Sequence, residues 1–440
     1  MLDRSVGSRV FTLVVSCIVG SVGGTLGAAD LPWPEKSRPA HVGHAAAADV
    51  AGLPTEWDEQ TGKNIAWSID LEGEGHSTPV VGHGRVWLTA ADRDGKRQFV
   101  YAIDTESGRV VHHQLLFENA TPEPLGNPIN TYASPSCFLE DDAVYVHFGT
   151  YGTARLDPKT ADVVWQRRDL NVRHFRGPGS SPIVFRDLLI LTFDGIDRQF
   201  VTALDKRTGA TVWTTTRSTD YGDLDKEGKP HRDGDMRKAY DTPRVVEVDG
   251  RPQLISIGSR AAFGYDPLTG RELWTLRHPN FNAAPRALYV PGLAILNTGS
   301  ERAVLWGLRL DASTQGDVTE SHVAWQRKKG NSALSSPVLV DGRVYFITAS
   351  GIAYCVDARS GEEIYEKRIG GVFTASPLVA GDRIYYCDEG GKTAVVRAGP
   401  TFELLAENKL ADGGRSSPSA AHGAIYLRTF SKLYKIAAKP

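Results

Sequence analysis

The sequence predicts an all-β protein: an eight-bladed β-propeller of four-stranded antiparallel blades, whose last blade is closed by an N-terminal strand. Three observations predict this fold. A nine-residue motif returns along the chain, eight prolines precede strand-like runs, and the last repeat lacks its fourth strand. Recurrence at intervals of roughly 40–60 residues is typical of repeat architectures, which can extend over several hundred residues as one unit.

The recurring motif runs from an Asp through a Thr-Gly turn to a Trp eight residues later. Its clearest copy is residues 205–213, and residues 157–165 and 266–274 keep the spacing. A weaker copy, residues 357–365, ends in Tyr. The turn residues allow a tight reversal of the chain, and the run that follows reads as a strand. Each copy therefore predicts a hairpin at the end of a repeat.

Eight prolines mark the starts of strands. Each follows a small residue and precedes apolar residues: Pro79, Pro135, Pro182, Pro243, Pro285, Pro337, Pro377 and Pro418. A proline at the first residue of a strand sacrifices no hydrogen bond of the sheet. Two further strand-like runs follow each proline, and no convincing helical periodicity separates them. Four short strands per repeat indicate the blade of a propeller.

The last repeat supports closure of the ring. After Pro418 it contains strand-like runs only over residues 424–427 and 433–436. The missing strand is expected near the N-terminus, where residues 58–67 carry another copy of the motif. An N-terminal strand that completes the C-terminal blade removes an exposed sheet edge. Seven internal blades and this shared blade make eight.

Composition excludes some classes of partner. The 440 residues are 41% hydrophobic and 23% charged, and the net charge is −2. Binding to nucleic acid or to anionic membranes generally needs concentrated positive charge. We therefore expect no nucleic-acid partner.

The N-terminus resembles a secretory signal, which defines the predicted domains. Two arginines precede an apolar run over residues 10–22, and small residues follow at 27–29. We expect a signal peptide over residues 1–29, a flexible leader over 30–56 and the propeller over 57–440. The apolar run is too short for a stable membrane span, so the mature chain should have none. The protein is expected to be exported to the periplasm, cell envelope or medium.

Two alternatives to a cleaved signal remain open. Residues 14–17 loosely fit a bacterial lipoprotein box, which would place a lipid anchor on Cys17. An uncleaved membrane anchor is the other. If Cys17 is removed, Cys137, Cys355 and Cys387 remain in apolar runs. Because three cysteines cannot all pair, buried free thiols are favoured over a disulfide framework.

The Asp-x-x-Thr-Gly-x-x-x-Trp pattern resembles the repeat of the pyrroloquinoline-quinone-like, or quinoprotein-type, β-propeller family, from about Asp58 to the end of the chain. This resemblance implies that the tryptophan docks the outer strand of one blade onto its neighbour, which is a structural role. His112 and Tyr365 replace it in two repeats, and the seventh repeat has lost the motif. The matching positions are Trp67, Trp165, Trp213, Trp274 and, after a longer insertion, Trp325.

Candidate binding residues lie in the loops that lead into the prolines. The longest are residues 117–133, 168–181 and 217–242, and long loops on a rigid scaffold are usual places for binding. Their polar side chains should converge on the mouth of the central channel, where they would suit an anionic or carbohydrate-like ligand. The alternative is that they bond to neighbouring loops and line a water-filled channel. The candidates are His76, Asn130, Tyr132, His174, Arg176, Lys238, Tyr240, Asn282, Asn331 and Arg415.

The sequence predicts no catalytic residue and no metal site. The loop from Asp223 begins like a calcium loop, but Gly234 occupies the position that needs a bidentate Glu, so a solvated acidic loop is favoured. A quinone-dependent dehydrogenase of the resembled family would need pyrroloquinoline quinone, calcium, a carboxylate base and two adjacent cysteines. The chain has no Cys-Cys pair and no Cys-x-x-Cys-His haem motif, and Asp241, two residues before Pro243, is the only acid that close to one of the eight prolines. No cofactor is expected, and the quinone with calcium is disfavoured.

The resemblance also extends to the non-enzymatic branch of the family, which includes the propeller lipoprotein of the outer-membrane β-barrel assembly machinery. We therefore expect an exported, monomeric propeller that acts as a scaffold for a protein or peptide partner in the cell envelope. The loops at residues 117–133, 168–181 and 217–242 are the expected contact surface. The alternative is a quinone- or small-molecule-binding propeller with dehydrogenase-like activity.

Overall fold

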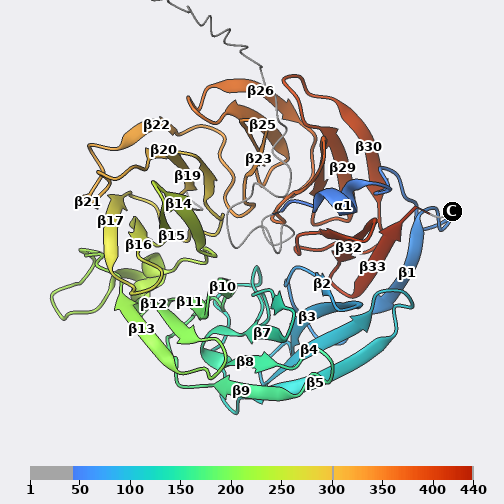
Figure 1. The fold of residues 1–440 in the computed structure, drawn as a ribbon, viewed down its shortest axis with the longest axis horizontal. Coiled ribbons are helices and arrows are strands. Elements are labelled where there is room, and N and C mark those ends of the chain that lie inside the picture. The colour runs from blue at the N-terminus through green and yellow to red at the C-terminus, as the bar shows by residue number, and fades with distance from the viewer. Residues whose placement is uncertain (1–42, 300–301, 439–440) are drawn as a thin grey trace, which may run out of the picture.

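Eight antiparallel sheets surround a central channel in the computed structural model of the chain, which describes residues 43–299 and 302–438 (Figure 1). Seven sheets have four strands, and the fourth blade gains a short fifth strand. This architecture confirms the predicted all-β, eight-bladed propeller. The helical segments of the described residues are short: α1 (Ala47–Val50), η3 (Gly149–Tyr151) and η4 (His231–Arg237).

The first four blades follow one another in the order of the sequence, and the strands of each blade run from the channel outward. They are β2 (Val80–Gly82), β3 (Arg85–Ala91), β4 (Arg97–Asp104) and β5 (Val110–Glu118); β6 (Phe138–Glu140), β7 (Ala143–His147), β8 (Thr153–Leu156) and β9 (Val163–Arg167); β10 (Ile183–Phe185), β11 (Leu188–Asp194), β12 (Gln199–Asp205) and β13 (Thr211–Thr216); and β14 (Arg244–Val248), β15 (Arg251–Ile257), β16 (Ala261–Tyr265) and β17 (Glu272–Arg277), with β21 (Gly316–Asp317) at its outer edge.

The other four blades complete the ring. They are β18 (Leu288–Val290), β19 (Leu293–Asn297), β20 (Leu305–Arg309) and β22 (Val323–Arg327); β23 (Val338–Val340), β24 (Arg343–Ile347), β25 (Ile352–Asp357) and β26 (Glu363–Arg368); β27 (Leu378–Ala380), β28 (Arg383–Cys387), β29 (Lys392–Arg397) and β30 (Leu404–Lys409); and β31 (Ser419–Ala421), β32 (Ala424–Arg428), β33 (Lys432–Ala437) and β1 (Ile65–Asp70).

The N-terminal strand β1 closes the last blade. It pairs antiparallel with β33, so that Trp67 lies opposite Lys435 and Ile69 opposite Leu433. This pairing confirms the predicted closure. It covers an edge of β33 that would otherwise be open to pairing with another chain.

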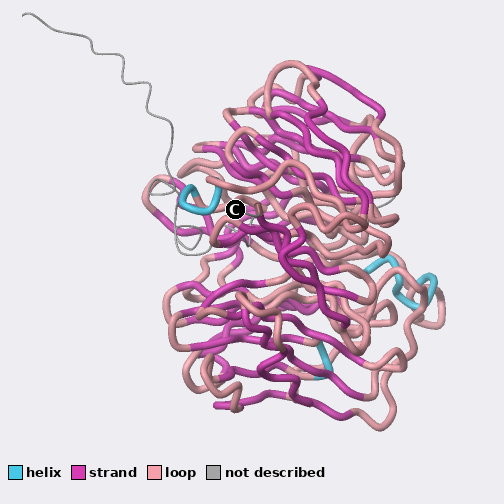
Figure 2. The backbone as a smooth tube through the Cα atoms, turned by 90° about the vertical axis from the view of Figure 1, so that its right-hand side faces the viewer, coloured by secondary structure: helices cyan, strands magenta, loops and turns pink. Residues whose placement is uncertain are grey.

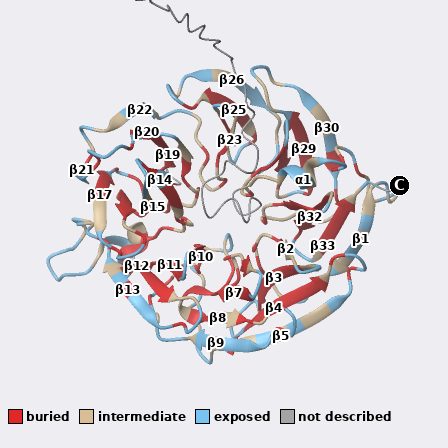
Figure 3. Cartoon of the chain, in the orientation of Figure 1, coloured by how far each residue is buried: buried red, intermediate tan, exposed pale blue. Residues whose placement is uncertain are grey.

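The core lies within and between the blades. The second and third strands of each blade are largely buried, whereas the outermost strands alternate or face solvent (Figure 3). In β11 every residue is buried, and Leu189 and Leu191 pack with Tyr145 of the preceding blade. Strands that are buried on both faces read as continuous apolar runs, which explains the sequence pattern.

The motif tryptophans contact the turn of the following blade at three junctions. The indole Nε1 atoms of Trp67, Trp165 and Trp213 donate to the backbone oxygens of Thr105, Lys206 and Pro267, at 3.1, 3.0 and 3.2 Å. The motif glycine allows this approach, because a Cβ on Gly209 would lie 2.8 Å from the Trp165 ring. That glycine also has a φ of +75°, which side chains disfavour.

Trp274 makes a different contact from the one expected of a motif tryptophan. It is fully buried and donates to Gln253 Oε1 of its own blade at 2.9 Å. The following blade carries an insertion in place of the motif turn, and this insertion supplies β21, which pairs in parallel with β17. Trp325, after the insertion, again approaches the turn glycine of the next blade, Gly361, whose added Cβ would lie 2.5 Å from the ring.

Six of the eight prolines directly precede an innermost strand, and two do not. Pro135 and Pro285 lie two residues earlier, and Cys137 and Ala287 occupy the position next to the strand. The eight prolines are therefore not all in one register. A proline restrains the extended chain at either place, so the sequence pattern did not separate the two arrangements.

The signal peptide, Cys17 and residues 30–42 lie outside the described residues. The described part of the leader, residues 43–56, is packed against the seventh blade rather than free. Leu53 is buried, and Arg383 donates to its carbonyl at 2.7 Å. Trp57, directly after the leader, is also buried and stacks on Tyr385 with ring centroids 6.4 Å apart. The Ala- and Pro-rich composition concealed these few anchoring side chains.

The three described cysteines, Cys137, Cys355 and Cys387, are buried and free. Burial raises the pKa of the Cys137 and Cys387 thiols to about 12, so these groups are poor nucleophiles. Within the described ranges, no helix has the length and apolar character needed to cross a membrane.

Candidate functional site

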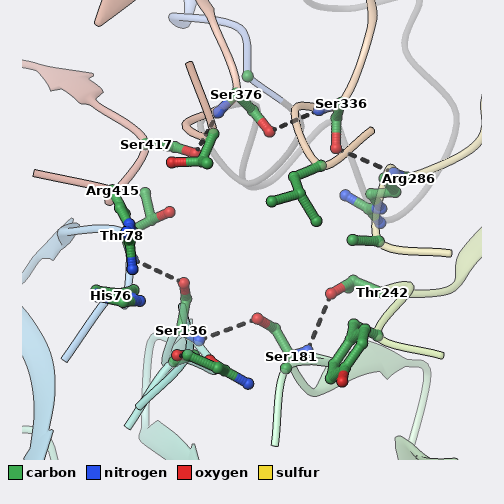
Figure 4. A pocket seen from close by; sticks show the side chains of 18 of the residues that line it. His76, Thr78, Ser136, Ser181, Thr242, Arg286, Ser336, Ser376, Arg415 and Ser417 are labelled. Carbon is green, nitrogen blue, oxygen red and sulfur yellow. Dashed lines mark hydrogen bonds between the residues drawn. The ribbon is translucent and has the colours of Figure 1, made fainter. Parts of the chain in front are cut away.

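A cavity of about 470 Å³ occupies the central channel. Its wall consists of residues that end the loops between blades or begin the innermost strands (Figure 4). Cavities of roughly 300–1,000 Å³ are typical of ligand sites. The three long loops at residues 117–133, 168–181 and 217–242 all contribute residues to this wall.

A ring of hydroxyl groups holds the innermost strands together. The backbone N–H just before one inner strand donates to the hydroxyl at the same position in the next blade. The bonds run from Thr78 to Ser136, Ser136 to Ser181, Ser181 to Thr242, Arg286 to Ser336, Ser336 to Ser376 and Ser376 to Ser417, at 2.8–3.0 Å.

Two of the eight junctions between the described blades lack this bond: the one from Ser417 to Thr78 and the one from Thr242 to blade five. The residue of blade five at the ring position is Arg286, whose guanidinium has no acceptor for the N–H of Thr242. Arg286 lines the cavity instead (Figure 4), and its Nη2 donates to the Pro243 carbonyl at 3.2 Å. The neighbouring Arg244 also lines the cavity, with Nη1 3.1 Å from the Ala287 carbonyl. Two guanidiniums from adjacent blades therefore share one wall.

The cavity wall is cationic. It contains Arg176, Arg244, Arg286 and Arg415 and the imidazole of His76, and none of the described residues that line it is an Asp or a Glu. Burial, with the charges of Arg428 and Arg415, lowers the pKa of His76 to about 3. His76 is thus neutral at physiological pH because protonation would add charge to a buried, positive site.

Two of these arginines are bound to carboxylates that lie behind the wall. Arg176 makes a bidentate pair with the buried Asp235, with Nε–Oδ1 and Nη2–Oδ2 distances of 2.5 and 2.6 Å. Arg415 lies 3.0 Å from Glu389. These pairs fix the guanidiniums in place.

The structure divides the predicted channel-mouth residues into two groups. His76, Asn130, Arg176, Tyr240, Asn282 and Arg415 line the cavity. The remaining residues do not line it: Tyr132, His174, Lys238 and Asn331. Tyr132 donates to the Glu123 carbonyl at 2.8 Å. Asn331 donates to the backbone carbonyl of Ala303 at 2.8 Å, so both stabilise neighbouring loops.

The three long loops bind one another. Glu123 Oε2 accepts from the N–H of Phe175 at 2.7 Å, and Glu123 Oε1 lies 3.3 Å from Arg173 Nε. Asn130 Nδ2 donates to the carbonyls of Arg176 and Pro178 at 2.8 and 2.9 Å. The loops at residues 117–133 and 168–181 therefore form one unit, and the Arg176–Asp235 pair joins the third loop to it.

Loop 117–133 also reaches the eighth blade. Arg415 Nη1 donates to the carbonyls of Pro128 and Ile129 at 2.9 and 2.8 Å. Phe430 lies beneath the same guanidinium, with the charge centre 5.9 Å from the ring centroid. The loop thus contacts the side of the cavity mouth formed by the last blade.

A buried lysine lies below these loops. The Thr150 N–H donates to His174 Nε2 at 3.0 Å, which assigns the imidazole proton to Nδ1. His174 Nδ1 is 3.3 Å from Lys238 Nζ. An ammonium cannot accept a hydrogen bond, so this contact is a hydrogen bond only when Lys238 is a neutral amine. Burial lowers the pKa of Lys238 to about 8 and that of His174 well below its ordinary value.

A buried ion pair supports the start of loop 217–242. Arg217 Nε and Nη2 lie 2.6 and 2.9 Å from the two carboxylate oxygens of Asp194, and Nη2 also donates to Ser256 Oγ at 2.9 Å. Both charged side chains are almost inaccessible to solvent, at 0% and 1% exposure. Burial opposes the charge on Arg217, but Asp194 outweighs it, so the pKa of Arg217 lies above its usual value.

Asp241, the acid two residues before Pro243, has a structural contact. It is fully buried, and its Oδ2 accepts from the N–H of Ile257 on β15 at 2.8 Å. Ser77 makes a similar contact in the first blade, where its Oγ accepts from the N–H of Thr89 at 3.1 Å. Burial raises the pKa of Asp241 to about 7.

The lining residues do not supply a calcium site beside a quinone. Calcium takes oxygen ligands, usually including carboxylates, and over residues 43–299 and 302–438 the lining side chains include arginines and no carboxylate. Among the described residues, no cluster of three or more His, Cys, Asp or Glu side chains could hold a metal ion. The side-chain amides among the described lining residues belong to Asn127, Asn130 and Asn282. We therefore assign no redox step to the described residues of the cavity wall.

Sequence reasoning missed the two arginines of the wall, Arg244 and Arg286. Arg244 directly follows Pro243 and Arg286 directly follows Pro285, so both were counted as part of a strand start. The available signal was the missing hydroxyl: the sequence around Pro285 has no Ser or Thr within two residues on either side.

Sequence comparison identifies one family. A family model described as outer membrane protein assembly factor BamB matches residues 15–170, 100–235 and 197–432. A curated protein, outer membrane protein assembly factor BamB of Legionella pneumophila (strain Paris), is 26% identical over 217 residues, which are 48% of this chain and 49% of that protein. The chain thus spans about half the length of the curated relative it matches.

Solved structures share the fold. BamB from Moraxella catarrhalis is 14% identical with a TM-score of 0.56, and the match covers 84% of this chain and 99% of that one. Quinohemoprotein alcohol dehydrogenase from Comamonas testosteroni is 14% identical with a TM-score of 0.60, covering 90% of this chain and 80% of that one. Since both identities are low, these similarities show the propeller fold alone.

Proposed function

Because the chain belongs to the family of the outer membrane protein assembly factor BamB, we propose that it is an exported propeller that binds a protein or peptide partner in the cell envelope. The observation that carries the proposal is the union of the loops at residues 117–133, 168–181 and 217–242 into one surface. Rigid, mutually bound loops lose little conformational entropy when a partner binds, so they are suited to recognition.

The location of this surface supports the proposal. The helical turns α1 and η4 lie on opposite faces of the ring, and η4 belongs to the third long loop (Figure 2). The described part of the leader therefore lies on the face away from η4.

Exposed apolar side chains on these loops would contact the partner. Ile129 and Leu224, from two of the three loops, are 47% and 62% exposed. Large apolar side chains at the centre of an interface commonly supply much of the binding energy. Polar and charged neighbours from the same loops would form the rim of such an interface.

Export and envelope location belong to the same proposal. They rest on the predicted signal over residues 1–29, on the lipoprotein-like box at Cys17 and on the family description. A monomeric state is proposed with them, since the ring closes within one chain.

The test is capture of partners from an envelope extract by the tagged protein. The double variant Ile129→Asp with Leu224→Asp should recover at least tenfold less partner, because two charges would have to be desolvated in the interface. Val164→Asp is the control, since Val164 is 50% exposed on an outermost strand and outside the three loops. Equal recovery by all three proteins would show that the loops are not the interface.

The quinone-binding alternative can be tested with the same preparation. Pyrroloquinoline quinone and calcium are added to the purified protein, and absorbance and thermal unfolding are recorded. A saturable spectral change with a rise in melting temperature would favour the small-molecule function over the scaffold.

A further inference from the structure

The loop at residues 117–133 is anchored on both sides of a short tip. Before the tip, the Gly126 N–H donates to a backbone carbonyl of loop 168–181 at 2.6 Å. After it, Asn130 Nδ2 donates to two backbone carbonyls of the same loop at 2.8 and 2.9 Å. The residues between these anchors, 127–129, are called the tip below. The tip therefore extends from a base that is fixed to one neighbouring loop.

The tip lies at the mouth of the central cavity. Asn127 and Ile129 both line the cavity, and Ile129 is also 47% exposed to solvent. The loop that carries them joins β5 to β6 at the end of the blades that also carries η4. A side chain that both lines a cavity and is exposed marks the boundary between that cavity and solvent. Entry into the cavity from the face of η4 therefore passes beside the tip.

An arginine of blade eight holds the tip from the other side of the mouth. Arg415 precedes β31 and lines the cavity beside His76 and Thr78 (Figure 4). Its Nη1 donates to the carbonyls of Pro128 and Ile129 at 2.9 and 2.8 Å. In the described part of the chain, the tip has no other hydrogen bond to blade eight. One guanidinium thus makes the polar connection across the mouth.

Arg415 is held in place without the tip. Its Nε lies 3.0 Å from a carboxylate oxygen of Glu389 in blade seven, and its charge centre lies 5.9 Å from the ring centroid of Phe430. The tip contributes only backbone carbonyls to this contact. Water can replace a hydrogen bond to an exposed carbonyl at modest net cost. The contact between Arg415 and the tip can therefore break and form again while the arginine stays in position.

We propose that the tip is a lid on the cavity mouth and that Arg415 is its latch. With both hydrogen bonds formed, the tip is closed against blade eight; when they break, it turns about Gly126 and Asn130 and the mouth widens. Gly126 is suited to a hinge, because glycine adopts a wider range of backbone conformations than other residues. Since Ile129 belongs to the contact surface proposed above, a partner bound there would act on the lid. Only this last consequence rests on the proposed function.

A thiol placed behind the lid reports how often it opens. Thr78 lines the cavity, and the bond from Ser417 to Thr78 is absent from the hydroxyl ring, so Thr78→Cys removes no contact of that ring. The test measures the reaction of this thiol, in the full chain, with a maleimide that carries a polyethylene glycol chain. The described native cysteines are buried, and the chain without Thr78→Cys gives the background rate.

The decisive variant is Arg415→Met in the Thr78→Cys background. Methionine keeps a long apolar side chain beside Phe430 but donates no hydrogen bond to the tip. The labelling rate should rise about tenfold, because loss of two hydrogen bonds leaves the lid open more often. Arg359→Met is the matched control, since Arg359 is an exposed turn residue between β25 and β26, and it should leave the rate unchanged.

Hydrogen exchange distinguishes a lid from a general loosening of blade eight. In the Arg415→Met variant, peptides that cover residues 126–130 should exchange faster, whereas peptides that cover β32 and β33 should keep their protection. An unchanged labelling rate would show that Arg415 does not control the mouth. Faster exchange in β32 and β33 as well would assign Arg415 a structural role, and either result overturns the proposal. Neither measurement needs a partner, so failure of the lid is distinguishable from failure of the scaffold function.

Discussion

The motif turns and the channel-mouth loops lie at opposite ends of the same outermost strands, and the contacts that join neighbouring blades differ between the two ends. At the turn end, Trp165 and Trp213 make the same hydrogen bond to a neighbouring backbone oxygen, and a glycine makes room for each ring. At the loop end the contacts differ from one pair of loops to the next. Asn130 donates to the carbonyls of Arg176 and Pro178, whereas Arg176–Asp235 and Lys238–His174 join loop 168–181 to loop 217–242.

The comparison shows what repetition means in a ring. The contact made by Trp67, Trp165 and Trp213 recurs with the same geometry, and the sequence repeats the same residues for it. The long loops follow no such repeat, and there the chain places buried charges whose desolvation is costly. The following experiments compare the two ends, from the largest expected effect to the smallest.

The largest effect is expected at the buried ion pair of the loop end. Asp194→Ala should lower the free energy of unfolding by about 3–5 kcal/mol, since it leaves the Arg217 charge buried without its partner. Asp142→Ala is the control, because Asp142 is 78% exposed and paired with Arg155; its cost should be below about 1 kcal/mol. Urea unfolding followed by tryptophan fluorescence measures both. Similar small losses would mean that the buried pair is relaxed or hydrated.

The buried lysine should make the loop end sensitive to pH. The folded-state pKa of Lys238 is about 8 and the ordinary value is 10.5, so as the pH falls from 10.5 to 8 the unfolded chain takes up the proton first. The free energy of unfolding should therefore fall over this range by up to roughly 3 kcal/mol, and the penalty is fully present below pH 8. Lys238→Met should lack this component.

The difference between the two unfolding profiles isolates the lysine from other groups that titrate near pH 10. A difference that stays constant from pH 7 to 11 would contradict a depressed pKa. In that case Lys238 would retain its charge in the folded protein, and its contact with His174 Nδ1 could not be a hydrogen bond.

At the turn end, a substitution should lower the free energy of unfolding through packing rather than through charge. Gly270 has a φ of +72°, and a Cβ there would collide with the Trp213 ring. Gly270→Ala should cost about 2–4 kcal/mol, the sum of backbone strain and overpacking. Gly250→Ala isolates the strain, because Gly250 has a φ of +74° and open space around it; we expect about 1–2 kcal/mol. Equal melting temperatures for the two variants would mean that the tryptophan contact is loose.

The smallest effect is expected at the exposed Asp of the motif. Asp205 Oδ1 accepts from the Thr208 N–H at 2.8 Å, and this bond is the main reason that the pKa of Asp205 is lowered. Asp205→Ala should cost about 1 kcal/mol at neutral pH. Because the folded pKa is depressed, the stabilisation is present above the unfolded pKa and is lost as the pH falls through the folded value.

The repeat provides an internal control for this measurement. Asp157→Ala and Asp357→Ala remove the equivalent bonds to the Thr160 and Ser360 N–H groups, and they should cost the same within a few tenths of a kcal/mol. Effects that differ widely among the three copies would show that the motif turns are not energetically equivalent.

Much of the fold could be predicted because its signals are local. The Asp-Thr-Gly-Trp spacing, the small-residue-Pro pairs and the missing last strand each depend on a few neighbouring residues, and the ring with its β1–β33 closure follows from them. Two errors have the same origin. Pro135 and Pro285 carry the local signal but lie two residues further from their strands than the other six prolines do. The leader at residues 43–56 is bound by isolated contacts such as that of Arg383 with the Leu53 carbonyl.

The candidate site was predictable only in outline. The sequence indicated which loops surround the channel, and His76, Arg176, Tyr240, Asn282 and Arg415 do line the cavity. It did not distinguish His174 from Arg176 or Lys238 from Tyr240, which are two residues apart in loops without a regular period. Arg286 differs from the hydroxyl residues at the same position of the other blades, and this shared position is evident only in the folded protein.

The sequence by itself therefore determined the number of blades, the closure of the ring and the turn-end contacts of Trp67, Trp165 and Trp213, because these repeats encode the same short-range geometry. The tertiary structure decided which loop side chains face the cavity and which are buried beneath it. That choice depends on how three loops from different blades pack on one another, and contacts such as Asn130 with Pro178 join residues that no local pattern relates.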